Sequence, residues 1–367
     1  MNTVIMRNVL WAGLTLRLVA VAEEPVWPVA PDAAVQGFVE TLRGRVDAAE
    51  LPTVVGADGW LFSRPELRHL SVGPFWGEAA LETSTATNED WRDPVPAIVQ
   101  FSDELKELGV ELLLLPVPPK ASIYADKLDD GLTADAEGRL PRVDIQHQAF
   151  YDQLREQGVQ VLDIAPLMLT MRQARAGDDA APEANCQTDT HWSPAAIEAV
   201  AGEIARWVAT RPWHDPDAAR ITYSERRADL TITGDLTVFL PEDERPGRET
   251  FSAVRFVGQP DAPARPVEAD RDSPVLLLGD SHTLVFSIGG EMHTTGAGLP
   301  DQLAYELGMP VDLLGRLGSG ATPTRVDLFR RARQDGYIEG KQLVIWCFRG
   351  MEFTENVDGW RPLPVKR

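Results

Sequence analysis

The sequence predicts an α/β fold, a doubly wound and mostly parallel sheet with helices on both faces. Short apolar runs bounded by turn residues alternate with segments in which apolar residues recur at helical spacing. Continuous apolar strands are typical of parallel sheets buried on both faces, and alternation of strands with helices is the pattern of such sheets. The 367 residues, 44% of them hydrophobic, are enough to enclose one large core. We expect about five parallel strands.

The regular pattern begins near residue 95, where apolar residues recur at helical spacing up to Gly109. The run from Val110 to Val117 is almost entirely apolar and predicts a buried strand. Ser193-Pro194 is a typical helix start, an N-cap residue followed by a first-turn proline. In chain order the further expected elements are helix 145–157, strand 159–164, helix 193–207, strand 275–279, helix 300–307, strand 311–314, helix 324–334 and strand 343–348.

The N-terminal segments have a different character. Residues 1–22 combine a basic start, an apolar stretch and an Ala-Val-Ala ending, which predicts a signal peptide or N-terminal anchor. An amphipathic helix of a cytosolic protein is the alternative. Residues 23–50 are expected to be a linker that closes with a short helix. The main domain then covers residues 51–360.

Within this domain, two stretches interrupt the strand–helix pattern. Apolar pairs around Asp58-Gly59 predict a hairpin over residues 54–62, and residues 64–93 have no clear period and are expected to be a surface loop. Residues 210–270 are rich in Arg, Asp, Thr and Pro with short β-like pieces. They predict a β-rich inserted subdomain beside the sheet.

The charge composition of the chain restricts the classes of molecule that it binds. The formal net charge is -21, from 56 acidic and 35 basic residues, so we expect no unspecific binding of nucleic acid or anionic lipid. The same charge repels a polyanionic polymer unless a basic groove is set aside for it. The two cysteines, Cys186 and Cys347, form one disulfide or remain free buried thiols, and the sequence leaves both alternatives open.

Polar residues gather where ligands bind in such sheets, at the carboxyl ends of the strands. Ser281 follows the strand 275–279, Lys120 follows 110–117 and Arg349 follows 343–348. A serine hydroxyl needs a base to take its proton and a third group to orient that base. His191 and Asp189, in the loop before the 193–207 helix, supply these residue types. We therefore predict a Ser281–His191–Asp189 catalytic triad.

Other residues near this triad have two interpretations each. Gly320 and the Ser281 backbone N–H are candidate oxyanion donors, although Gly320 also fits a plain turn. Lys120 and Arg349 are candidate substrate ligands. The alternative for Lys120 is a surface lysine, and for most of the C-terminal arginines it is a solvated helix face, from which Arg349 is set apart by its place at a strand end. His282 lines the pocket or caps a turn. A metal site of Asp189, His191 and either His282 or His293 is the disfavoured alternative, because no helix carries a histidine pair at ligand spacing. We expect no metal.

The motif order resembles one family. Asp-Thr-His-Trp-Ser-Pro at 189–194, followed later by Gly-Asp-Ser at 279–281, is similar to the alginate O-acetyltransferases of the J and X type, which are SGNH-hydrolase-like. In ordinary SGNH hydrolases the serine comes first, so this order is permuted. Residues 56–62, 116–120 and 344–348 fit the same resemblance. No C-terminal carbohydrate-binding module is expected, which brings the chain closer to the J type.

The resemblance implies acetyl transfer through acetyl-Ser281 to hydroxyls of an exported polysaccharide in the periplasm or cell envelope. It implies a membrane-bound acyltransferase partner and no cofactor beyond an acetyl donor, either that partner or a small acetyl ester. A carbohydrate acetylesterase with the same triad and a catalytically silent polysaccharide-binding or assembly protein are the alternatives. The acceptor polysaccharide and the oligomeric state stay open.

Overall fold

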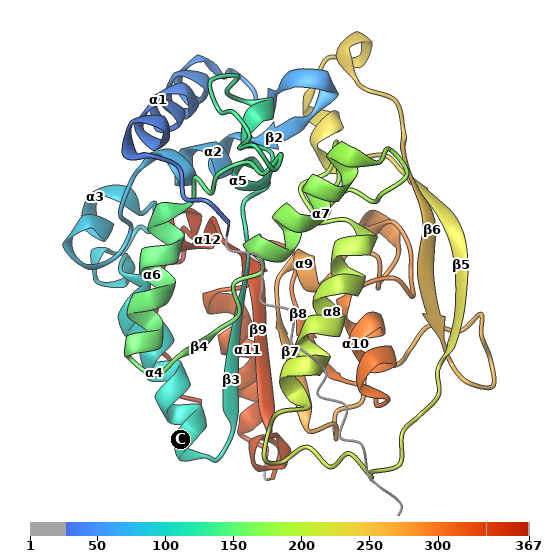
Figure 1. The fold of residues 1–367 in the computed structure, drawn as a ribbon. Coiled ribbons are helices and arrows are strands. Elements are labelled where there is room, and N and C mark those ends of the chain that lie inside the picture. Colours follow the sequence, from blue (N-terminus) through green and yellow to red (C-terminus); the bar gives the residue numbers. More distant parts are fainter. Residues whose placement is uncertain (1–26, 335, 366–367) are drawn as a thin grey trace, which may run out of the picture.

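The computed structural model describes residues 27–334 and 336–365, so the segment 1–22 lies outside the described residues. Its centre is a five-stranded parallel sheet in the order β4-β3-β9-β7-β8 (Figure 1). These strands are β4 (Gln160–Val161), β3 (Glu111–Val117), β9 (Leu343–Arg349), β7 (Val275–Gly279) and β8 (Asp312–Gly315). The predicted fold class is confirmed.

Helices cover both faces of this sheet, because successive side chains of a strand point to opposite faces. Leu113, Leu277 and Ile345 pack with one set of helices, while their chain neighbours pack with the other set. The first set is α7 (Ala165–Gly177), α8 (Pro194–Val208) and α10 (Leu299–Leu307); the second is α4 (Pro94–Glu107), α6 (Ile145–Glu156) and α11 (Thr322–Ala332). Figure 1 shows α8 and α10 on one side of the strands and α4 and α6 on the other.

Local signals explain where these helices begin and end. Ser193 caps α8 by accepting a hydrogen bond from Ala196 N at 3.1 Å, with Pro194 in the first turn as predicted. Asp93 caps α4 in the same way, through Val95 N at 3.1 Å. Gly308 ends α10 in the left-handed region, with φ 66°.

Two segments differ from their expected structure. The segment 23–50 contains the expected helix, but this helix, α1 (Asp32–Ala48), fills most of the supposed linker and buries Val35, Phe38 and Leu42 in the core. The supposed surface loop 64–93 begins with α2 (Arg64–Ser71), a helix too short to give a readable period. The remaining short helices are α3 (Ala80–Thr83), α5 (Lys120–Ile123), α9 (Ser281–Leu284) and α12 (Glu352–Glu355). The helix α7 was not predicted either.

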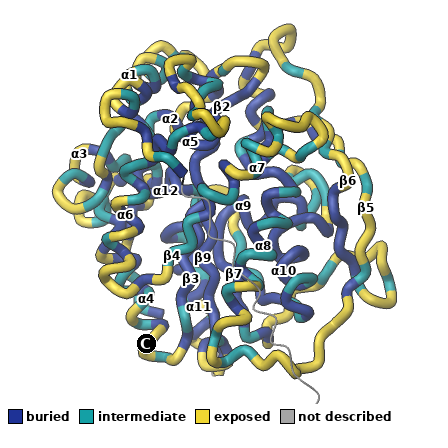
Figure 2. Tube along the Cα trace, in the orientation of Figure 1, coloured by how far each residue is buried: buried dark blue, intermediate teal, exposed yellow. Residues whose placement is uncertain are grey.

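The two predicted β features are present. β1 (Thr53–Val55) and β2 (Leu61–Ser63) form the antiparallel hairpin, and the insertion forms a second antiparallel pair, β5 (Ser224–Ile232) and β6 (Glu249–Gly258). Much of β5 is exposed, in contrast to the buried central strands (Figure 2). The insertion is more than a neighbour of the sheet, because the 3-10 turn between its strands, residues 235–239, reaches the site described below.

Both cysteines are free and buried, which excludes the disulfide. Within the described ranges, we find no helix with the length and apolar character needed to cross a membrane.

Candidate active site

Three strand ends meet at one edge of the sheet. β9 lies between β3 and β7, and the register sets Val117 beside Arg349 and Gly279 beside Cys347. A pocket of about 260 Å³ opens at this edge. Its apolar lining is Pro52, Pro65, Pro118, Pro119, Phe239 and Met351, among others. Its polar lining includes Glu66, Lys120, Thr190, Asp235, His282 and Arg349.

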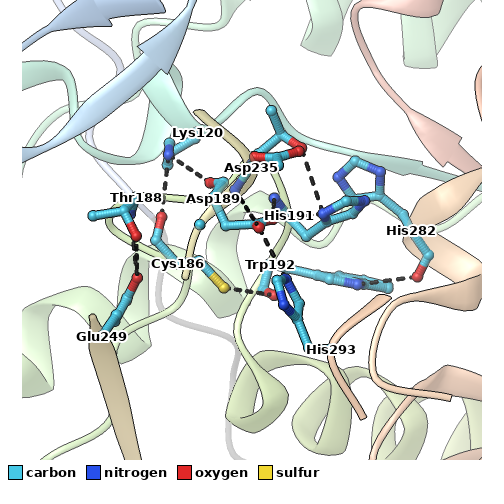
Figure 3. Close-up of polar contacts among 12 residues, drawn as sticks. Lys120, Cys186, Thr188, Asp189, His191, Trp192, Asp235, Glu249, His282 and His293 are labelled. Atoms are coloured by element: carbon cyan, nitrogen blue, oxygen red, sulfur yellow. Dashed lines mark hydrogen bonds and ion pairs between the residues drawn. The ribbon is translucent and has the colours of Figure 1, made fainter. Parts of the chain in front are cut away.

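The structure brings Asp189 and His191 into direct contact (Figure 3). His191 Nδ1 lies 2.6 Å from Asp189 Oδ1, and the backbone N–H of His191 donates to the same oxygen at 3.1 Å. The second oxygen, Oδ2, accepts from His293 Nε2 at 2.9 Å and from Asp235 N at 2.9 Å. Burial alone would raise the pKa of Asp189, but these hydrogen bonds and the two histidines lower it well below its usual range. Asp189 is therefore a fixed anion.

The second ring nitrogen of His191, Nε2, is available to accept a proton. It is buried and has no hydrogen-bond partner among the described residues. Burial lowers the pKa of His191, but the hydrogen bond and charge of Asp189 outweigh it and the net pKa is raised. The contact with Asp189 assigns the proton to Nδ1 in the neutral ring. Nε2 then carries a lone pair, as a general base requires.

Ser281 begins α9 directly after β7, on a turn that its neighbours fix. A Cβ on Gly279 would lie 1.8 Å from Cys347 O, so only glycine fits there. Asp280 caps α9 through His282 N at 2.9 Å and accepts from Arg349 N at 2.9 Å, which joins the ends of β7 and β9. In the described structure no hydrogen bond joins the Ser281 hydroxyl to His191. Such bonds are often open in unliganded enzymes and tighten in the complex.

Trp192 ties the two motifs together. Its indole Nε1 donates to His282 O at 3.1 Å, and the rings of His191 and His282 lie 4.7 Å apart. The turn that carries Ser281 is thereby docked on the segment that carries His191. His282 also lines the pocket.

Lys120 reaches the site, but its ammonium group faces protein rather than the pocket. Nζ donates to the carbonyls of Cys186 at 3.1 Å, Gln187 at 3.4 Å and Asp189 at 2.8 Å. Three donors are all that an ammonium group has. In this structure Lys120 therefore holds the loop of Asp189, which differs from the predicted substrate contact.

The structure shows a packing role for Gly320, and its role as an oxyanion donor stays a prediction. It is buried, and a Cβ there would lie 2.8 Å from Asp280 N and 2.9 Å from the Cβ of Phe348. Its carbonyl accepts from Trp346 Nε1 at 2.8 Å. Gly320 lets two segments approach behind the Ser281 turn and is absent from the pocket lining described above.

Arg349 lies at the pocket as predicted. Its side chain is 32% exposed, and Nε and one terminal nitrogen each contact Glu352 Oε1 at 3.0 Å. Burial lowers the pKa of Arg349, but Glu352, Asp280 and Asp235 more than offset it and raise the pKa.

Three residues of the site were not found from the sequence. Glu66 lies on α2 inside the supposed loop, and Asp235 lies in the insertion. His293 was weighed only as a metal ligand. It has φ 71° and ψ -62°, and Thr294 N donates to Met292 O at 2.9 Å around it. This is a strained γ-turn, and strain of this kind gathers at functional sites.

Asp189, His191 and Asp235 also offer ligand atoms that lie within 4.8 Å of one another. Apart from His191 Nε2, the ring nitrogen and carboxylate oxygen atoms of these residues already have hydrogen-bond partners. His191 Nδ1 is bonded to Asp189, and the two Asp235 oxygens accept from Thr190 N at 2.8 Å and Thr190 Oγ1 at 2.6 Å. The donor set fits a hydrogen-bond network better than a metal site.

A family model for the SGNH hydrolase-like domain of the acetyltransferase AlgX matches residues 53–349. The chain belongs to this family. Among curated relatives, a probable alginate O-acetylase AlgJ of Pseudomonas putida is 30% identical over 243 residues, 64% of this chain and 53% of that protein. Its counterpart of Pseudomonas aeruginosa is 26% identical over 308 residues, 80% and 68% of the two chains.

Solved structures agree on the fold. The O-acetyltransferase domain of Pseudomonas putida AlgJ superposes with TM-score 0.58 at 21% identity, covering 82% of this chain and 92% of that one. Pseudomonas aeruginosa AlgX superposes with TM-score 0.53 at 15% identity, covering 89% and 71%. The family resemblance stated from the motifs is thus confirmed. The chain spans about half the length of the Pseudomonas putida relative, 53%.

Proposed function

We propose that this chain is a serine-dependent O-acetyltransferase that acetylates hydroxyls of an exported polysaccharide. The observation that carries the proposal is the Asp189–His191 hydrogen bond of 2.6 Å, which leaves a buried, unpartnered Nε2 next to the turn of Ser281. Membership of an acetyltransferase family and the names of the AlgJ relatives support the reaction class.

In the first half-reaction, Ser281 Oγ attacks the carbonyl carbon of the donor acetyl group while His191 Nε2 takes the hydroxyl proton. The tetrahedral intermediate collapses, the bond to the donor's leaving group breaks, and the imidazolium returns its proton to that group. The product is acetyl-Ser281. Asp189 keeps the ring oriented and stabilises its charged form, while the Ser281 backbone N–H is a donor to the oxyanion.

In the second half-reaction, His191 Nε2 takes the proton of a sugar hydroxyl, and the sugar oxygen attacks the acetyl carbonyl carbon. The Ser281 ester bond breaks, and Ser281 Oγ recovers a proton from the imidazolium. The acetyl donor is a small acetyl ester or an acetylated partner, for which a membrane-bound acyltransferase is the natural type. The polysaccharide places the reaction in the periplasm or cell envelope.

Transfer and hydrolysis share the acyl-enzyme, so the assay must separate them. The protein is incubated with p-nitrophenyl acetate with and without oligosaccharides, and acetylated sugar and free acetate are both measured. We expect acetylated sugar with the wild type and none with Ser281→Ala. Acetate as the only product identifies an esterase. Sugar acetylation that survives in Ser281→Ala overturns the proposal.

A further inference from the structure

The charges around the pocket restrict what it accepts. Its four charged lining groups are two cations, Lys120 and Arg349, and two carboxylates, Glu66 and Asp235. Both cations already have partners. Lys120 donates to three backbone carbonyls and has Glu66, Asp189 and Asp235 in its electrostatic surroundings.

Arg349 is likewise compensated. It contacts Glu352, and Asp280 and Asp235 also act on its charge. When the buried carboxylates of Asp189, Asp280 and Glu352 are included, the surroundings of the pocket carry more negative than positive charge. The whole chain, at -21, adds to this field. A polymer with a carboxylate on each sugar is repelled here unless it displaces one of these partners, and displacement leaves a buried acid unpaired.

The walls suit a different ligand. The four prolines and Met351 form apolar surfaces, and Phe239 is 46% exposed at the end of the inserted turn. An exposed aromatic face carries negative potential and attracts the polarised C–H groups of a sugar ring. Pockets of this kind combine apolar walls with a few polar groups that fix orientation.

Three polar residues line the same pocket and suit hydroxyls. Glu66 lines the pocket and is 5% exposed, and its carboxylate oxygens accept hydrogen bonds from a hydroxyl. Thr190 lines the pocket immediately before His191 in the chain. His282 also lines it, and its ring is tilted by 52° against that of His191, with the ring centroids 4.7 Å apart. A sugar in this pocket is therefore held next to the proposed base.

We propose that the acceptor of this site is an uncharged sugar unit, stacked on Phe239 and screened against uronates by Asp235 and its neighbouring carboxylates. This inference rests on the proposed function and narrows it to a neutral polysaccharide, although the AlgJ relatives are named for alginate.

The test compares two ligands that differ only in charge. One is a defined alginate oligosaccharide, and the other is the same oligosaccharide after reduction of its carboxylates to alcohols. Their binding to Ser281→Ala is measured by calorimetry, since that variant does not turn over. We expect the reduced oligosaccharide to bind at least about tenfold more tightly at low salt, and the gap to narrow as salt screens the repulsion. Equal or tighter binding of the uronate, or binding of neither ligand, overturns the inference.

Pairs of matched variants show which residues cause the difference in binding between the two oligosaccharides. Asp235→Asn should narrow the difference between the two ligands, whereas Asp243→Asn removes the same charge from an exposed position of the same insertion and should leave it unchanged. Phe239→Ala should weaken the binding of the neutral oligosaccharide. Val238 is 60% exposed and lies outside the pocket lining, so Val238→Ala should leave this binding unchanged. If both members of each pair behave alike, the assigned residues are wrong.

Failure of the proposed function has a separate signature. Acetylation of wild-type protein by p-nitrophenyl acetate tests Ser281 as the acyl carrier without any sugar. A protein that acetylates Ser281 yet prefers the uronate contradicts only the acceptor assignment. A protein that binds the neutral ligand but never acetylates Ser281 contradicts only the chemistry.

Discussion

The protein buries two groups of histidines, and their partners differ. His191 faces a carboxylate through Nδ1 and leaves Nε2 unpartnered. His69 and His147 face each other, with their Nε2 atoms 2.8 Å apart, and His69 Nδ1 is 2.8 Å from Thr354 Oγ1. Both rings also lie next to Phe75.

The pKa values follow from this difference. Burial lowers the pKa of His69 well below its usual value and lowers that of His147 to about 4. Burial acts on His191 too, but Asp189 reverses its effect. Burial alone thus makes a neutral structural histidine, whereas burial with a carboxylate and an open Nε2 makes a general base.

Removing one histidine from each group should have very different effects on activity. His191→Ala should lower kcat/KM for sugar acetylation by about 10⁴, the effect typical of a lost triad base. His69→Gln should retain kcat/KM within about threefold below its melting temperature, because it does not touch the reacting atoms. Initial rates at several sugar concentrations measure both. Comparable losses of kcat/KM in the two variants would contradict the assignment of His191 as the base and of His69 as a structural residue.

Asp189→Asn tests the role of the carboxylate and should lower kcat by about 10⁴. It also gives a pH signature. Activity requires neutral His191, so the rate of the wild type should rise with pH through the raised pKa of His191. Without the Asp189 charge that pKa falls, and the acid limb of the profile should move to lower pH. An acid limb that stays in place in the variant would show that another group titrates.

His293 offers a finer test, since it holds Asp189 Oδ2 from a strained turn. His293→Gln should lower kcat by about tenfold, the worth of one hydrogen bond to a charged group, with little change in KM for the sugar. A purely structural role predicts a lower melting temperature and unchanged kcat. The two quantities are measured on the same preparation.

The last test concerns the pH dependence of protein stability that arises from the other histidine group. The folded pKa of His147, about 4, lies below the unfolded value of 6.5, so the unfolded chain binds more protons between these limits. Stability should fall as pH drops from 6.5 towards 4, by about 3 kcal/mol from this residue. In His147→Gln this acid sensitivity should be smaller, and denaturant titrations across the range measure it. An unchanged pH dependence would show that His147 is solvated.

Particular residues show how far the sequence predicts this molecule. The strands at 111–117, 275–279 and 343–349 are buried and apolar, so their periodicity and the strand-end rule located Ser281, Lys120 and Arg349 correctly in the fold. Glu66 and Asp235 were missed, because an eight-residue helix and an insertion have no readable period. The hydrogen bonds that the Lys120 ammonium group donates could not be predicted either. The carbonyls that accept them belong to a loop whose path is set only by tertiary packing.

Mapping the acetyl group on the protein shows whether Ser281 carries it. The protein is mixed with p-nitrophenyl acetate, quenched in acid within the first turnover and digested, and the acetylated peptide is sequenced by mass spectrometry. We expect acetyl on Ser281 in the wild type, and a greatly reduced yield in His191→Ala. Acetyl on another side chain, or sugar acetylation with Ser281 unmodified at every time point, would contradict this expectation.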